Sequence, residues 1–171
     1  MREKLSSLLI DPDRDRRNQF YLALDLLQIS KACIAQDNTS KALDYLKKQS
    51  GFTPDYIFLD SLQPSDEALL FLRELRKIKR LKQVPLIWYA PSFNAAQEQA
   101  MLEAGFAAGL VKQEKLLQLK ENLRILFQSD LQEALLPDGM SAAARFKMKM
   151  KDVLLQTQLL LDTPKHLLST R

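Results

Sequence analysis

Acidic side chains follow two of the short apolar runs in this sequence, and a lysine follows a third. In chain order they are Asp11, Asp13, Asp60 and Lys112. Carboxylates held close together repel one another unless a cation balances them, and a hard divalent ion such as Mg2+ prefers oxygen ligands. Carboxylates with an ammonium group beside them are typical of phosphoryl transfer. That reaction requires an in-line nucleophile and neutralisation of the negative charge spread over the phosphoryl oxygens. The set therefore predicts a phosphoryl site in which Asp60 is the central carboxylate.

A plainer interpretation exists for each of these residues taken singly. Loops are solvated, so acids and lysines often stand where a strand ends. That interpretation accounts well for any single member of the set, but it accounts less well for the full set. A shared site requires secondary-structure elements that bring these residues to one place.

Short apolar runs alternate with longer amphipathic ones, which is the pattern of strand and helix units in a parallel sheet. The expected strands are residues 5–10, 32–35, 56–59, 86–89 and 108–111. The expected helices are residues 14–27, 40–49, 66–78, 94–104 and 114–127, with Thr39 and Ser65 as amino-terminal caps. Strands 56–59 and 86–89 are apolar on both sides, which places them at the centre of a sheet covered on both faces. Functional residues of such sheets collect at the carboxyl ends of the strands, where the acids and the lysine stand.

Composition excludes several classes of protein. Hydrophobic residues make up 46% and charged residues 27% of the 171 residues, which is the balance of a soluble globular chain rather than a disordered one. Cys33 is the only cysteine, so an internal disulfide and a cysteine-rich zinc site are both excluded. With four glycines, no GxGxxG or Walker A loop can be written, and the single histidine argues against a Ser-His-Asp triad.

The amino terminus has only a short apolar run closed by acids, so it predicts neither a signal peptide nor a membrane span. We therefore expect a cytoplasmic protein. The net charge of +4 is too small to require nucleic acid. The basic cluster in residues 73–82 contains an acid and no aromatic residue, which favours the solvated end of a surface helix over a DNA-binding surface.

The alternation of strand and helix segments ends near Ser129. This change predicts a domain over residues 1–128 and a helical extension over residues 129–171. Within the extension, residues 141–161 predict a helix with apolar residues on two faces. A helix that lies only on its own domain needs one such face, so we expect contact with a second copy of the chain, a homodimer. A tail docked in a single way is the alternative.

Residues 5–127 resemble the receiver domain of bacterial two-component response regulators. The resemblance rests on the segments LLIDPD at 8–13, DYIFLD at 55–60 with Pro64 after it, VPLIWY at 84–89, and Ala104-Gly105 leading to Lys112. It implies a flavodoxin-like (βα)5 doubly wound parallel sheet of order 2-1-3-4-5. It also implies a histidine kinase or phosphotransfer protein as partner and Mg2+ as cofactor.

The same resemblance assigns roles to individual residues. Asp60 corresponds to the phosphoryl acceptor and Lys112 to the invariant lysine, and these two are the candidate catalytic residues. Asp11 corresponds to the first of the acidic pair, and the expected metal ligands are Asp11, Asp13 and Asp60.

The sequence departs from the family at positions that matter. Pro12 stands where the second metal-binding acid is usual, so Asp13 would have to substitute for it. Ala90 replaces the hydroxyl residue that bonds the phosphoryl oxygen, and Gly109 stands where an aromatic residue is common. Gln113 replaces the proline that usually follows the lysine. In this family the acceptor and the conformational readout rest on different residues, and the resemblance implies that two of the readout residues are missing here.

Two functions remain open at this stage. The first is a non-enzymatic receiver of a phosphorelay, phosphorylated on Asp60 and acting through protein contacts. The second is a pseudo-receiver that is never phosphorylated and serves as a constitutive protein-binding or dimerisation module.

Overall fold

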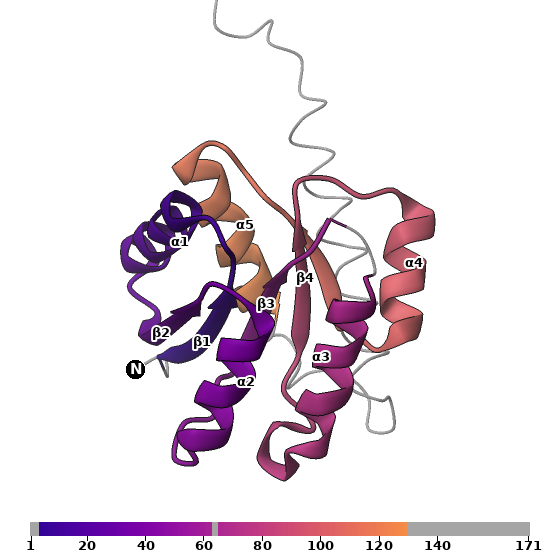
Figure 1. Ribbon diagram of the computed structural model, residues 1–171. Coiled ribbons are helices and arrows are strands. Elements are labelled where there is room, and N and C mark those ends of the chain that lie inside the picture. Colours follow the sequence, from indigo (N-terminus) through magenta and orange to yellow (C-terminus); the bar gives the residue numbers. More distant parts are fainter. Residues whose placement is uncertain (1–3, 63–64, 130–171) are drawn as a thin grey trace, which may run out of the picture. The chain divides into compact units, whose positions relative to one another are not determined.

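The computed structural model describes residues 4–62 and 65–129 (Figure 1). The chain divides into two units, Met1–Arg124 and Ile125–Arg171, and all the strands of the described residues belong to the first. Of the second unit the described part is residues 125–129. The expected homodimerisation helix at 141–161 and the extension at 129–171 thus lie outside the described residues, apart from Ser129 itself.

Strands and helices alternate along the described chain. The strands are β1 (Leu5–Ile10), β2 (Ser30–Gln36), β3 (Tyr56–Asp60), β4 (Leu86–Ala90) and β5 (Ala108–Val111). The helices are α1 (Arg14–Leu27), α2 (Thr39–Lys48), α3 (Asp66–Lys77), α4 (Ala95–Ala104) and α5 (Leu116–Ser129), with a short 3-10 helix η1 (Lys79–Leu81). All strand pairs are parallel and their order is β2-β1-β3-β4-β5, so the predicted topology is confirmed. The expected central strands, β3 and β4, each have a strand on both sides.

The register of the sheet aligns the carboxyl ends of its strands. Ile10 pairs with Leu59, Asp60 with Tyr89, and Ala90 with Val111. The residues that follow β1 and β5, and the last residue of β3, therefore come to one edge of the sheet. This alignment is what places Asp11, Asp60 and Lys112 near one another.

Helices cover both faces of the sheet (Figure 1). On one face, buried residues of α2, α3 and α4 share a core with alternate residues of the strands, including Leu8, Leu59 and Trp88. On the other face, Phe20 of α1 packs edge-on against Phe58 and Tyr89, with ring centroids 4.9 and 5.7 Å apart. Burial of apolar side chains on both faces is what requires the near-continuous apolar runs of β3 and β4.

Helix caps agree with the sequence in one case and differ in another. The Ser65 side chain accepts a hydrogen bond from the Ala68 backbone at 3.1 Å, which confirms it as the cap of α3. The prediction of Thr39 as the cap of α2 is wrong by one residue, because Asn38 accepts from the Lys41 backbone at 2.9 Å and Thr39 is the first helical residue. Asparagine and threonine are both good caps, so the loop geometry decides between neighbours.

None of the helices in the described part of the chain is long and apolar enough to cross a lipid bilayer.

Candidate functional site

The ammonium group of Lys112 joins two carboxylates at the carboxyl edge of the sheet. Its Nζ lies 2.8 Å from Asp11 Oδ2 and 2.9 Å from Asp60 Oδ1. Asp11 is 0% exposed and Lys112 is 9% exposed, whereas Asp60 is only partly buried. The structure thus brings together three of the four residues that the sequence singled out, with one of them, Asp60, facing solvent.

Because Asp11 and Lys112 are buried, their ion pair holds the carboxyl ends of β1 and β5 together. A charge in the interior is costly unless it is paired and hydrogen-bonded, and removing one partner of a buried pair costs about 3–5 kcal/mol. Asp11 satisfies both oxygens, because Oδ1 accepts from the Asp13 backbone at 2.9 Å and Oδ2 accepts from Lys112. Arg17 of α1 donates to the carbonyls of Asp11 and Pro12 at 2.7 and 3.0 Å and fixes the turn between β1 and α1.

The pKa values of Asp60 and Asp13 are shifted in opposite directions. Burial raises the pKa of Asp60 above its ordinary value, although the hydrogen bond from Lys112 opposes the shift. A backbone hydrogen bond from Arg16 lowers the pKa of Asp13, and a second one from Asp15 adds to it. Asp60 is therefore the more basic carboxylate of the two.

Asp13 serves as the amino-terminal cap of α1. Its Oδ1 accepts from the backbones of Asp15 and Arg16 at 2.8 and 3.1 Å. This use follows from position, because Asp13 immediately precedes the helix and aspartate is among the preferred caps. One of its two carboxylate oxygens is thus committed to the helix.

The carboxylates as they stand do not form a ready-made site for a divalent cation. A magnesium or calcium site needs several oxygens that are free to converge on one point. Here each oxygen of Asp11 accepts a hydrogen bond, one oxygen of Asp13 caps α1, and Lys112 bridges Asp11 and Asp60. Pro12 contributes no ligand side chain, and no group of three or more acids, histidines or cysteines in residues 4–62 and 65–129 is placed to hold a metal.

No family model and no curated protein matches this chain. Solved structures do match. A putative response regulator of Chloroflexus aurantiacus J-10-fl is 19% identical, with a TM-score of 0.57 over 71% of this chain and 96% of that one. A response regulator in red light signalling of R. palustris is 19% identical, with a TM-score of 0.63 over 72% of this chain and 92% of that one. The Mn2+-bound form of response regulator Rcp1 is 18% identical, with a TM-score of 0.55 over 80% and 97%.

This chain has the receiver-domain fold. Identities near this level carry the fold, and the residues of the site must carry the rest. Within the fold, Lys112 contacts both Asp11 and Asp60, and these three residues form one corner of the sheet edge.

Positions 90 and 109, where the sequence departs from the family it resembles, carry neither a hydroxyl nor an aromatic side chain. Ala90 is fully buried at the end of β4 and has only a methyl group there, so it donates no hydrogen bond to a group on Asp60. Gly109 lies in β5 against the ring of Phe93, which belongs to the segment between β4 and α4. An aromatic ring therefore does lie beside position 109, but it comes from another part of the chain.

Two residues of the corner were not identified from the sequence. The charge of Arg16, in the first turn of α1, adds to the lowering of the Asp13 pKa and opposes the rise that burial causes in the Asp60 pKa. Lys112 Nζ lies 5.0 Å from the centre of the Tyr89 ring, which is close enough for a cation–π contact. Arg16 could have been found, because the first turn of α1 follows β1 at the same edge. The approach of Tyr89 to Lys112 depends on tertiary packing and has no sequence signal.

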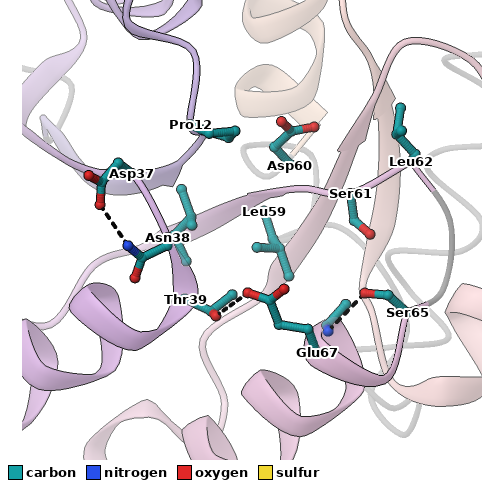
Figure 2. Close-up of a pocket in the computed structure, with 12 residues that line it drawn as sticks. Pro12, Asp37, Asn38, Thr39, Leu59, Asp60, Ser61, Leu62, Ser65 and Glu67 are labelled. Carbon is teal, nitrogen blue, oxygen red and sulfur yellow. Dashed lines mark hydrogen bonds between the residues drawn. The ribbon is translucent and has the colours of Figure 1, made fainter.

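A pocket of 470 Å³ opens beside Asp60, between the residues that follow β1, β2 and β3 (Figure 2). Its lining is mixed, with apolar residues such as Ile10, Leu59 and Ala68 beside polar residues of the three loops. Thr39 donates to Glu67 across the rim at 2.6 Å and so ties the start of α2 to the start of α3. The Asp60 carboxylate thus borders an open, water-accessible hollow rather than a closed one.

The basic cluster of residues 73–82 is partly structural. Arg76 donates to the carbonyls of Leu81 and Val84 at 3.0 and 2.8 Å, which holds η1 and the approach to β4. Arg80 donates to the carbonyls of Leu46, Gln49 and Phe52 at the end of α2. These two guanidinium groups are committed to backbone carbonyls, which supports the interpretation of the cluster as a helix end.

Proposed function

We propose that this chain is a receiver-type signalling protein in which Asp60 accepts a phosphoryl group from a histidine kinase or a phosphotransfer protein. The observation that carries the proposal is the contact of Lys112 with both Asp11 and Asp60 at the carboxyl edge of the sheet. An ammonium held there neutralises charge on a group bound at Asp60, and the partial exposure of Asp60 gives a donor access to it.

The proposed transfer uses the oxygen of Asp60 that Lys112 does not hold. Oδ1 is paired with Lys112, so Oδ2 attacks the phosphorus of a phosphohistidine. The new oxygen–phosphorus bond forms as the phosphorus–nitrogen bond breaks, and the imidazole nitrogen keeps the electron pair of that bond. The product is an acyl phosphate on Asp60, with Lys112 beside its added negative charge.

The expected Mg2+ ligation by Asp11, Asp13 and Asp60 enters no step of this transfer. A receiver of the same fold, Rcp1, binds Mn2+. In this chain one oxygen of Asp13 caps α1 and each oxygen of Asp11 already accepts a hydrogen bond, which weakens the donor set for a divalent ion. Lys112, with Arg16 nearby, is the positive charge that this chain itself supplies.

Protein contacts are the proposed output, and the chain is not proposed to turn over a substrate. Leu22 and Leu26 of α1 stand four residues apart and are 55% and 50% exposed, which leaves apolar surface on one helix for a partner. A homodimer through residues 141–161 and a cytoplasmic location stay predictions from the sequence. Light scattering of the full chain tests the dimer, and a monomeric mass at high concentration would rule it out.

The acceptor is tested by incubating the full chain with acetyl phosphate, with and without Mg2+, and measuring intact mass. We expect one phosphoryl adduct, absent from Asp60→Asn and retained in Asp44→Asn, a control on the exposed face of α2. An adduct that persists in Asp60→Asn, or none in the wild type, would contradict the proposal.

A second candidate is the pseudo-receiver, which two observations favour. The Asp13 carboxylate caps α1 rather than standing free for a metal, and the buried methyl of Ala90 replaces a hydroxyl at the end of β4. In that case the ion pair of Lys112 is a permanent structural element and the chain binds its partner in one state. The absence of an adduct under every phosphodonor condition would favour this function.

A further inference from the structure

Trp88 holds the backbone that directly follows the acceptor residue. Its indole Nε1 donates to the carbonyl oxygen of Ser61 at 2.5 Å, and Ser61 comes immediately after Asp60. The Trp88 side chain is 0% exposed and lies in the core between the sheet and α2, α3 and α4. A buried N–H that loses its acceptor is costly, so the position of Ser61 and that of the indole are tied.

The ring of Phe93 packs against the indole of Trp88. The two rings stack, with centroids 4.8 Å apart and planes inclined by 30°. Phe93 is only partly buried and stands between β4 and α4, so of the two rings it is the one with room to move.

Gly109 makes this stack possible. A Cβ placed on Gly109 would lie 2.6 Å from Phe93 Cζ and 3.0 and 3.1 Å from the two Cε atoms. Contacts under 3.0 Å do not occur for real Cβ atoms, so any other residue at position 109 would displace the ring. The φ angle of Gly109 is not positive, so glycine is needed there for space rather than for backbone conformation.

We propose that Trp88 is the positioning residue of the segment after Asp60, and that Phe93, seated over Gly109, passes a shift of that segment to the β4–α4 connection. A movement of the Ser61 carbonyl either breaks its hydrogen bond or turns the indole. Because the rest of the indole is enclosed by core side chains, the turn is taken up by the ring stacked on it. The coupling of this device to phosphorylation rests on the proposed function, whereas the positioning role does not.

The chain carries a single tryptophan, so its spectrum contains one indole N–H signal and one assignment suffices. The positioning role is tested on Gly109→Ala in the full chain, with Gly51→Ala as the matched control, because nothing lies within 4 Å of a Cβ at Gly51. We expect Gly109→Ala to shift the indole signal and to speed amide exchange at Ser61 and Leu62 by about tenfold. Gly51→Ala should leave both unchanged.

A double-variant cycle separates this role from a general loss of stability. Phe93→Ala removes the ring that a methyl at position 109 would meet, so Gly109→Ala should have a smaller effect on the indole signal in the Phe93→Ala background. Additive effects, or faster exchange spread evenly over the sheet, would overturn the positioning role.

Coupling is tested by following the Phe93 ring signals during reaction with acetyl phosphate, with intact mass measured on the same sample. We expect the ring signals to move in step with the adduct in the wild type. An adduct without any movement of the Phe93 ring would overturn the coupling and leave the proposed function standing. If no adduct forms, the proposed function and the coupling both fail, and the cycle at positions 93 and 109 still decides the positioning role.

Discussion

Lys112 lies over the face of the Tyr89 ring, 5.0 Å from its centre, while it bridges Asp11 and Asp60. Tyr89 is buried, and its hydroxyl has no hydrogen-bond partner among the described residues. The ring and the hydroxyl of this residue therefore have opposite consequences for stability. The ring supports a buried cation, whereas the hydroxyl is an unsatisfied polar group.

Tyr89→Phe and Tyr89→Leu separate these two effects. The phenylalanine variant keeps the aromatic face and removes the unpaired hydroxyl, so we expect unchanged or slightly increased stability. The leucine variant loses the cation–π contact and aromatic packing and should lose about 2 kcal/mol. Urea unfolding at neutral pH measures both, and equal stabilities of the two variants would contradict the role of the ring.

Lys112→Met should be strongly destabilising, because it leaves the fully buried carboxylate of Asp11 without its cation. We expect a loss of about 3–5 kcal/mol in the free energy of unfolding. Lys115→Met is the control, since Lys115 is exposed and has no ion pair among the described residues, and it should change stability by less than about 0.5 kcal/mol. If the two variants were equally stable, Asp11 would not depend on Lys112.

The raised pKa of Asp60 gives its carboxyl a definite pH dependence. Because the folded state binds this proton more tightly than the unfolded state, the contribution of Asp60 to stability falls as pH rises from its ordinary value of 3.8 through the raised folded pKa. Asp60→Asn removes that loss. The stability of the variant minus that of the wild type should therefore increase from acid to neutral pH. Urea unfolding of both proteins across this interval measures the difference, and a variant that loses ground as pH rises would show that the shift has the opposite sign.

Pro12→Asp should add a carboxylate ligand and so strengthen the binding of divalent cations beside Asp60. The new carboxylate would stand beside Asp60 while Asp13 keeps its place as the cap of α1. We expect Mn2+ to broaden amide signals near residues 12 and 60 saturably in this variant, but not in the wild type at the same concentration.

Pro12→Ala is the control for the loss of the proline ring, and it should resemble the wild type. Saturable broadening of equal strength in the wild type would show that Asp11, Asp13 and Asp60 rearrange to bind the ion.

Arg80→Met should destabilise the fold by about 1–3 kcal/mol, because it removes the donor to three carbonyls at the end of α2. Lys82→Met, which changes an exposed residue of the same basic cluster, should have little effect. Thermal unfolding compares them. A gel shift with duplex DNA that survives moderate salt and is lost in Lys82→Met would instead assign this cluster to nucleic acid.

Much of this protein could be predicted from its sequence because the relevant signals are local. The bounds of β1, β5 and α1 agree with the expected ranges, since hydrophobic period and capping residues lie within each segment. The meeting of Asp11, Asp60 and Lys112 could also be predicted, because parallel strands bring their carboxyl ends to one edge.

The tertiary structure alone decided how the side chains at that edge are used. Asp13 is the exception, because its position directly before α1 already favours the cap that its carboxylate forms. The stack of Phe93 on Trp88 above Gly109, and the bond from Trp88 to Ser61, join residues of different strands and loops. Such contacts depend on which side chains of different strands and loops point toward one another. The periodicity of apolar residues along one segment does not specify this.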